Sequence, residues 1–364
     1  MTRRANKQKG GDELELLAAL QDDLNKRFGP DAAAPLTAQE TLSRIDHWVT
    51  SRSIVVDSVL RGLRPAPSSL IPFGRQVELS GPENSGKTTL TAQIAAETQS
   101  RGGLVMVFDT EERIDEPYWQ KLGVNTSRVL NVPSNSLDEI FDKQYAALDF
   151  AKSQAPDRLI LLIWDSLGGT SGADVVDRKS KESPMEQAAK FNMRKAKKIA
   201  DGIVLINSIV TDTRACYLYT NHEYTDINVK YGDNRQTHGG KKPKYFATVR
   251  LRLTPVGKIK EPDLSGGQDQ VIGQRVRVKA LKNSMSGTLL ERDAVIMAGR
   301  GFVNEYTVME QAEKMGLCKT SGSWSTWITP QGEEVKWQGW RGFEQKVVTH
   351  EDYESLQEAV LAGM

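Results

Sequence analysis

Residues Gly81 to Leu90 read GPENSGKTTL, and their types and spacing are suited to holding a phosphate group. Gly81, Gly86, Lys87 and Thr88 match the pattern GxxxxGK[ST]. In such a loop, backbone N–H groups point at phosphate oxygens, the lysine reaches the terminal phosphates and the threonine hydroxyl binds Mg²⁺. The pattern therefore predicts a nucleotide phosphate site, formed by Gly81, Pro82, Glu83, Asn84, Ser85, Gly86, Lys87, Thr88 and Thr89.

The flanking residues predict the elements that would position this loop. GRQVELS (74–80) reads as a buried strand, and KTTLTAQIAAETQ (87–99) has apolar residues at helical spacing. A chance match to the pattern would lack this strand, loop and helix order. We therefore predict a functional phosphate-binding loop.

Carboxylates that could serve the phosphate site follow two other apolar strands. LILLIWD ends in Asp165, which we predict to bind the metal together with Thr88. LVMVFDTEE supplies Asp109, Glu111 and Glu112, any of which could orient the attacking water. The residues by themselves leave that choice open.

Composition limits the other possibilities. The chain has 364 residues, a formal net charge of +1 and two cysteines. Its longest apolar run, LILLIW (159–164), is far shorter than a membrane span, and its N-terminus has no apolar signal segment. The two cysteines indicate neither a disulfide framework nor a zinc site. We expect a cytoplasmic protein without a membrane partner.

The pattern along the chain suggests three parts. Residues 1–47 hold a helix from Asp12, whose apolar stripe needs a partner surface, followed by a linker. Residues 48–300 alternate apolar strands with helices, which predicts an α/β core with a mostly parallel central sheet. Residues 301–364 read as a small α+β C-terminal domain, with a core that contains Trp324, Trp327, Trp337 and Trp340.

Two segments are candidates for binding DNA. Residues 177–198 hold eight basic and three acidic residues, a local positive charge that the net charge conceals. The alternative is that these charges lie on a solvated helix face without a binding function. Residues 223–240 form a long polar stretch with an aromatic ring that could stack on bases. The DNA contacts that we predict are Arg178, Lys179, Lys190, Lys197, Lys230, Tyr231, Arg235, Gly239 and Gly240.

Five ordered blocks of the chain resemble the RecA-family homologous recombinases, both the bacterial proteins and the related phage-encoded UvsX-type enzymes. The blocks are GPENSGKTTLTAQIAAETQ, VFDTEERIDEPYWQKLGVN, LLIWDS, HGGKKPKYFATVRLRL and RVKALKN. The resemblance implies a RecA-like P-loop NTPase core with an N-terminal helical arm that docks on the next subunit. It also implies ATP and Mg²⁺ as ligands, with ATP held between subunits.

The resemblance further assigns individual residues. Glu111 matches the catalytic glutamate, and Asp115 with Tyr118 matches the pair that contacts adenine. Tyr245 matches an aromatic residue that inserts into the neighbouring subunit, and Lys282 matches a lysine that reaches that neighbour's ATP. Lys190 and Lys197 also match basic DNA contacts of the family.

Two further positions depart from the family's pattern. His222 stands where the family usually has a glutamine, and is either a structural histidine or a sensor of the γ-phosphate. Ser284 stands where bacterial members commonly have a lysine. The charge supplied to the neighbouring site is then that of Lys282, with Lys279 or Arg277 as possible additions.

The resemblance implies a DNA-dependent ATPase that forms a helical filament on single-stranded DNA and exchanges strands with homologous duplex DNA. Single-strand-binding and loader proteins are further expected partners, and the host is a bacterium or its phage. Two other functions remain open, a ring helicase or translocase with the same core and a non-catalytic ATP-binding recombination mediator. Measurements of ATP turnover and of strand pairing would distinguish these functions from a recombinase.

Overall fold

The computed structural model describes residues 2–30, 32–35, 45–63, 70–133, 136–169, 184–225, 234–261 and 269–364. Within these ranges, the side chains of residues 2–12, 138 and 184–192 are not described. The chain divides into two compact units, Met1–Asp46 and His47–Met364.

The N-terminal unit contains one helix, α1 (Thr2–Phe28), among its described residues. It begins ten residues before the expected start at Asp12 and ends where expected, because Gly29 takes φ +115° and stops the helix. Leu17, Leu20 and Phe28 of the predicted stripe are exposed. The helix thus presents apolar side chains that the described residues of its own unit do not cover.

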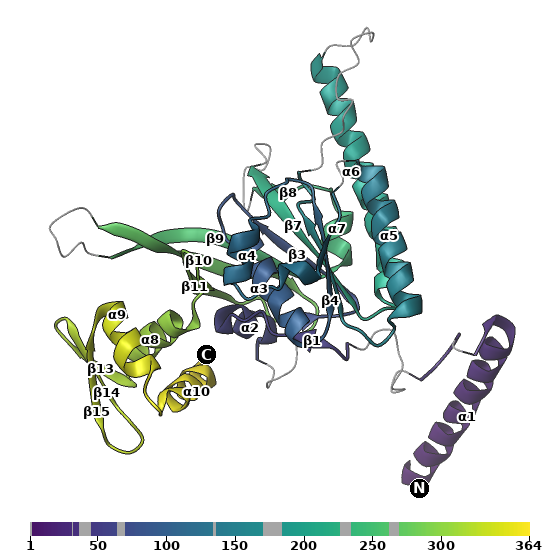
Figure 1. The fold of residues 1–364 in the computed structure, drawn as a ribbon. Coiled ribbons are helices and arrows are strands. Elements are labelled where there is room, and N and C mark those ends of the chain that lie inside the picture. Colours follow the sequence, from purple (N-terminus) through teal and green to yellow (C-terminus); the bar gives the residue numbers. More distant parts are fainter. Residues whose placement is uncertain are drawn as a thin grey trace. The chain divides into compact units, whose positions relative to one another are not determined.

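The second unit is built on one large sheet (Figure 1). Across this sheet the described strands follow one another in the order β12 (Gly301–Phe302), β11 (Glu291–Met297), β10 (Gln270–Asn283), β9 (Ala247–Glu261), β3 (Arg75–Gly81), β7 (Ala215–Thr225), β6 (Ile160–Asp165), β4 (Leu104–Asp109) and β5 (Val129–Asn131). The strands from β9 to β5 are parallel, whereas β9 through β12 pair antiparallel. A short strand, β8 (Arg235–Thr237), pairs antiparallel with the end of β7.

Helices cover both faces of the parallel part of this sheet. On one face, α5 (Leu137–Gln154) and α6 (Pro184–Val210) share an apolar core with β4, β6 and β7. The other face packs against α3 (Lys87–Ser100). Because both faces are buried, these strands are continuous apolar runs, as in ILLIWD of β6. The remaining elements of this core are β1 (Trp48–Val49), α2 (Ile54–Arg61), β2 (Ile71–Pro72), α4 (Glu116–Lys121), a 3-10 turn (Thr126–Arg128) and α7 (Lys242–Phe246).

The C-terminal region has an apolar core of its own. A three-stranded antiparallel sheet packs with helices, and its elements are α8 (Asn304–Lys314), β13 (Cys318–Ser321), β14 (Trp324–Ile328), β15 (Glu334–Gln338), α9 (Gly339–Phe343), a π-helical turn (Glu344–Val348) and α10 (Tyr353–Gly363). Trp327 and Trp337 are buried in this core and Trp340 packs against it. Trp324 is 50% exposed, so its assignment to the core was wrong. Its ring lies on the outer face of β14, with the ammonium of Lys346 5.9 Å from the ring centre.

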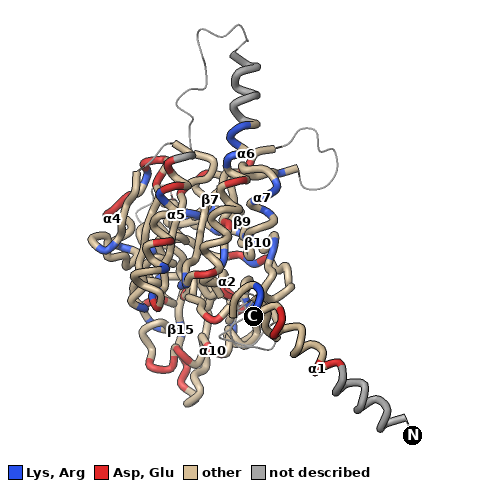
Figure 2. The backbone as a smooth tube through the Cα atoms, turned by 90° about the vertical axis from the view of Figure 1, so that its right-hand side faces the viewer, with Lys and Arg blue, Asp and Glu red and all other residues tan. Residues whose placement is uncertain are grey.

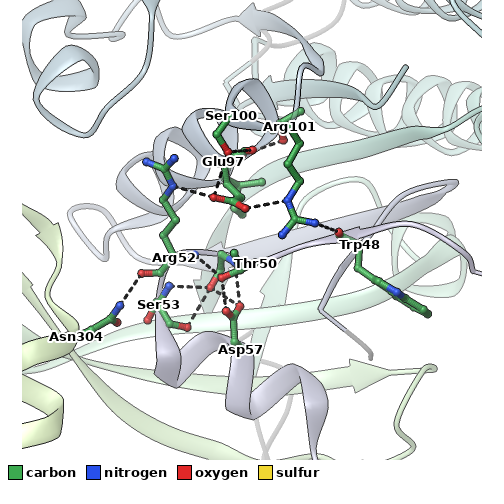
Figure 3. A network of polar contacts seen from close by, with 12 residues as sticks. Trp48, Thr50, Arg52, Ser53, Asp57, Glu97, Ser100, Arg101 and Asn304 are labelled. Atoms are coloured by element: carbon green, nitrogen blue, oxygen red, sulfur yellow. Dashed lines mark hydrogen bonds and ion pairs between the residues drawn. The ribbon is translucent and has the colours of Figure 1, made fainter. Parts of the chain in front are cut away.

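A polar network joins the start of α2, helix α3 and the C-terminal region (Figure 3). The Asp57 carboxylate accepts hydrogen bonds from Thr50 and Ser51, and Arg52 pairs with Glu97 of α3 at 3.2 Å. The Asn304 side chain accepts from the Ile54 amide at 2.9 Å and donates to the Arg52 carbonyl at 3.1 Å. The first turn of α8 is therefore fastened to the core by side-chain bonds as well as by the chain.

The α/β fold with a mostly parallel central sheet is confirmed. The pair 246–256 and 274–283 is antiparallel as predicted, although both strands extend further, as β9 and β10. Cys216 and Cys318 are free and buried. In the described part of the chain, no helix combines the length and the apolar character needed to span a bilayer.

Candidate functional site

The GPENSGKTTL loop lies between β3 and α3, where the sequence predicts it. Gly81 must be a glycine because a Cβ there would lie 2.2 Å from the carbonyl oxygen of Leu253. Gly86 has φ +91°, and a Cβ there would meet Cδ1 of Ile296 at 2.2 Å. Asn84 also has positive φ, at 56°. The glycines therefore allow a tight loop that the neighbouring strands closely enclose.

Lys87 points into this loop. Its ammonium donates to the carbonyl oxygens of Gly81 at 3.0 Å and Pro82 at 2.8 Å, and the residue is 7% exposed. Burial lowers the pKa of Lys87, while the charges of Asp165 and Glu111 oppose the fall. The Ser85 hydroxyl is buried and has no partner among the described atoms. A buried cation beside an unsatisfied hydroxyl fits a phosphate group.

Thr88 and Asp165 meet at the carboxyl edge of the sheet. The Thr88 hydroxyl donates to Oδ2 of Asp165 at 2.8 Å, and the Thr220 hydroxyl donates to Oδ1. Burial raises the pKa of Asp165, and the two hydroxyl bonds oppose that rise. A hydroxyl and a carboxylate oxygen are hard ligands that suit Mg²⁺ when phosphate and water complete its octahedron. The predicted metal pair is therefore together in space.

Glu111 lies beside His222 in the structure. Oε1 of Glu111 is 2.8 Å from Nε2 of His222 and also accepts from the Ser166 hydroxyl, while Oε2 lies 3.3 Å from Arg113. The hydrogen bond with His222 is the largest cause that lowers the pKa of Glu111 to about 2; Ser166 and the nearby positive charges add to it, against burial. His222 is placed there because it pairs with Gly81 across β7 and β3.

The structure distinguishes the three acids that follow β4. Asp109 accepts hydrogen bonds from the backbone amides of Glu111, Arg113 and Ile114, at 3.0 to 3.1 Å, so it shapes the turn. Glu112 is exposed and has φ +53°. Glu111 shares a wall of the loop's cavity with Asp165 and His222. Asp109 also lines this cavity, but the turn engages its carboxylate, so Glu111 remains our prediction for the acid that acts there.

The cavity beside the loop has a volume of about 580 Å³. Of the predicted nucleotide contacts, residues 83–89, Asp115 and Tyr118 line it; Gly81 and Pro82 serve it through the carbonyls that bind Lys87. The Tyr118 hydroxyl is 3.0 Å from that of Thr89, and Asp115 caps α4. The opposite wall was missed by the sequence interpretation: Gln274 of β10 and residues 296–299 at the end of β11. No local motif marks these residues.

Comparison with known proteins decides the family. The family model described as the RecA N-terminal domain matches residues 15–303.

The chain belongs to the RecA family.

Curated relatives agree with this assignment. Protein RecA of Borreliella afzelii (strain PKo) is 31% identical over 278 residues, which cover 76% of this chain and 70% of the relative. Protein RecA of Geobacter sulfurreducens is 30% identical over 301 residues, 83% of this chain and 81% of the relative. Protein RecA of Rhodopseudomonas palustris is 29% identical over 313 residues, 86% of this chain and 82% of the relative. The chain is therefore a RecA-family recombinase.

The two predicted RecA-type interface residues are neighbours in space. The ammonium of Lys282, on β10, donates to the carbonyl oxygens of Tyr245 at 2.6 Å and Lys244 at 3.3 Å, at the end of α7. Tyr245 is 71% exposed. Neither residue is among the described residues that line the cavity of their own chain.

The first DNA-binding candidate is only partly described. Arg178 and Lys179 lie outside the described residues, and the side chain of Lys190 is also outside them. Lys197 is exposed on α6. Basic residues are frequent along α6 and α7 (Figure 2). Lys195, two residues earlier, is turned inward and donates to the carbonyl of Gly168 at 2.9 Å.

The second candidate segment begins and ends close to the nucleotide cavity. Lys230 and Tyr231 lie outside the described residues, and Arg235 is exposed on β8. The Asn221 side chain donates to the His238 carbonyl at 3.0 Å and accepts from the His238 amide at 3.2 Å. Gly239 and Gly240 follow, in a cavity of about 390 Å³ that Lys195 and Tyr224 also line. Asn221, the residue before His222, therefore ties the end of this segment to β7.

Buried ion pairs support the strands that carry the phosphate loop and lead to the second DNA-binding candidate. Glu78 of β3 pairs with Arg250 of β9 and accepts from Asn221 at 2.9 Å. Glu223, next to His222, pairs with Arg252 at 2.5 Å and accepts from the Ser80 hydroxyl at 3.1 Å. These bonds hold β7 in register with the strand that carries the phosphate loop.

Proposed function

We propose that this protein is a DNA-dependent ATPase that forms helical filaments on single-stranded DNA and pairs that strand with homologous duplex DNA. The observation that carries the proposal is the contact between Glu111 and His222. His222 lies on β7, whose far end leads into the segment 223–240 that we predict to bind DNA. One strand thus links the nucleotide cavity to a DNA-binding candidate.

The residues of the cavity have separable roles in this proposal. Lys87 and the amides of residues 83–88 bind the phosphates, and Asp115 with Tyr118 binds the base. Thr88 and Asp165 would hold Mg²⁺, which would supply positive charge to offset the negative charge that develops on the phosphates. Glu111 orients and deprotonates the attacking water. Ser166 holds the Glu111 carboxylate in place, and His222 does so while no γ-phosphate is bound.

His222 is the proposed sensor of the γ-phosphate. A γ-phosphate beside Glu111 competes for the hydrogen bond with His222, and a change at His222 moves its neighbours Asn221 and Glu223. Asn221 binds the backbone of His238, directly before Gly239 and Gly240. ATP binding in this way favours the DNA-binding state, and hydrolysis reverses it.

The proposed filament forms by head-to-tail contacts that do not close into a ring. Residues 1–47 form the docking arm, and docking on the next subunit would cover the exposed leucines of α1. Residues 48–300 form the ATPase core, in which Tyr245 and Lys282 contact the next subunit. Lys282 supplies charge to that subunit's ATP. Lys279 or Arg277 would contribute further charge in place of the lysine that Ser284 replaces. Residues 301–364 are the small C-terminal domain, and single-strand-binding and loader proteins remain expected partners.

Joint-molecule formation between single-stranded DNA and homologous duplex DNA tests this function, with ATP compared with a non-hydrolysable analogue. Pairing with both nucleotides is expected, because binding energy forms the active filament. Lys87→Ala should fail with both, and a heterologous duplex is the matched control. ATP hydrolysis on DNA without pairing would favour a translocating motor and contradict the proposal.

A further inference from the structure

The far wall of the nucleotide cavity reaches the phosphate loop directly. Gln274 of β10 and Ile296 of β11 are cross-strand partners, and both line the cavity. The side-chain amide of Gln274 donates to the carbonyl oxygen of Asn84 at 2.7 Å, across 190 positions of sequence. Ile296 fills the space where a side chain of Gly86 would lie. The β10–β11 pair therefore touches the loop at two successive points.

The bond from Gln274 controls the direction of one loop peptide. In a planar trans peptide, the carbonyl oxygen and the following N–H point in opposite directions. With the Asn84 carbonyl held toward Gln274, the N–H of Ser85 points away from β10. Asn84 has φ +56°, in the left-handed region that asparagine adopts more readily than most residues. The Ser85 amide is one of the donors that we propose for phosphate.

The residue after Gln274 is anchored on the opposite face of β10. Successive side chains of a strand point to opposite faces, and Arg275 binds Glu310 of α8. The two bonds are 2.6 Å and 2.5 Å long and join the two terminal guanidinium nitrogens to both carboxylate oxygens. Such a two-point pair fixes orientation as well as distance. The C-terminal region thus holds the strand position that carries Gln274.

A second arginine repeats this arrangement at the end of β11. Gly299 lines the cavity, and the next residue, Arg300, pairs with Glu344 and lies 5.8 Å from the centre of the Trp340 ring. Both partners belong to the C-terminal region. Among the described residues, none beyond Gly299 lines the cavity itself. The C-terminal region therefore supports this wall without touching its interior.

We propose that Gln274 is a positioning residue of the nucleotide site: it holds the Asn84–Ser85 peptide in its phosphate-binding orientation, and the Arg275–Glu310 pair keeps Gln274 in place. This inference rests on the proposed function, because it assumes that the loop binds ATP. It adds that docking of the C-terminal region contributes to ATP affinity.

Gln274→Met tests the first half, because methionine keeps the length of the side chain and removes the donor. The Kd of the full-length protein for a fluorescent ATP analogue, with Mg²⁺ and without DNA, should rise about fivefold, as expected for one lost hydrogen bond. In ATPase assays KM should rise while kcat stays unchanged, because the loop holds ground state and transition state alike. Unchanged affinity, or a fall in kcat at constant KM, would overturn the proposal.

Glu310→Gln tests the second half and should also raise the Kd for the fluorescent ATP analogue. Glu334→Gln is the matched control, because Glu334 belongs to the same region but pairs with Lys336 inside the small sheet. The double variant Arg275→Glu with Glu310→Arg reverses the ion pair. It should bind the analogue with wild-type affinity if the pair acts by keeping Gln274 in place. Wild-type affinity in Glu310→Gln would overturn the anchoring role. Failure of the wild-type protein to bind the analogue would instead overturn the proposed function itself.

Discussion

Nε2 of His222 lies 2.8 Å from Oε1 of Glu111, although 111 positions separate the two residues in the chain. The pairing arises because β7 lies beside β3 and Gly81 is in register with His222. It joins the acid that we propose for water activation to the strand that leads to the second DNA-binding candidate. The contact therefore offers a direct physical link between nucleotide state and DNA affinity.

Glu111→Gln should lower kcat for ATP hydrolysis by about 100-fold or more, because the amide cannot take a proton from water. Affinity for ATP should be retained, since the side-chain volume is unchanged. Steady-state hydrolysis on single-stranded DNA and nucleotide titration measure the two quantities. Unchanged turnover would contradict the catalytic role of Glu111, whereas absence of hydrolysis in the wild-type protein would favour an ATP-binding mediator.

His222→Ala should keep ATP binding but remove the effect of ATP on DNA affinity. Coupling between two sites typically changes affinity about 5- to 150-fold, and this ratio should fall toward one in the variant. Fluorescence anisotropy with labelled single-stranded DNA, with and without the ATP analogue, gives the ratio. His222→Gln is the matched control, because its amide can still bond to Glu111 and should keep the coupling. A wild-type ratio in His222→Ala would leave His222 a structural residue.

The depressed pKa of Glu111 predicts a component of acid sensitivity. Its folded pKa is about 2 against an ordinary 4.5, so the unfolded chain takes up the proton first as pH falls. The stabilisation is complete above pH 4.5 and is lost as pH falls toward 2. It amounts to at most about 3 kcal/mol, since one pKa unit corresponds to about 1.36 kcal/mol. Urea unfolding of nucleotide-free protein between pH 7 and 3 measures it, and Glu111→Gln should show a shallower loss of stability.

Arg250→Met should lower the free energy of unfolding by roughly 3 to 5 kcal/mol, because it leaves the Glu78 carboxylate buried without its charged partner. Adding Glu78→Gln should recover much of that loss, since the neutral amide can still accept from Asn221. Lys152→Met, which removes an exposed ion pair with Asp212, is the control and should cost less than about 1 kcal/mol. Equal effects of the two single variants would contradict a role for the buried pair.

Tyr245→Ala should reduce the cooperativity of ATP hydrolysis, because the exposed ring is proposed to insert into the next subunit. The Hill coefficient should fall toward one, whereas Tyr245→Phe keeps the ring and should keep the coefficient. Stability should change little, as the side chain is 71% exposed. An unchanged Hill coefficient in the alanine variant would count against coupling between neighbouring ATP sites through Tyr245.

The sequence was sufficient to predict the parts of the site that short local patterns encode. The loop 81–90 has its structure because its glycines, its lysine and the flanking strand and helix are adjacent in the chain. Apolar runs predicted the parallel strands for the same reason. The end of α1 was predictable from Gly29, whereas its start was not, because residues 2–11 have no apolar stripe to mark a helix.

The tertiary structure decided which distant residues meet. Asp109, Glu111 and Glu112 are chemically similar and adjacent in sequence, so only the turn after β4 and the register of β7 with β3 select Glu111. Gln274 is an unremarkable polar residue until the antiparallel pair β10–β11 brings it to the carbonyl of Asn84. Strand register and order determine such contacts across more than 100 residues, and no local pattern encodes them. The chain's own sequence thus determines the phosphate loop, whereas the packing of its strands determines what surrounds it.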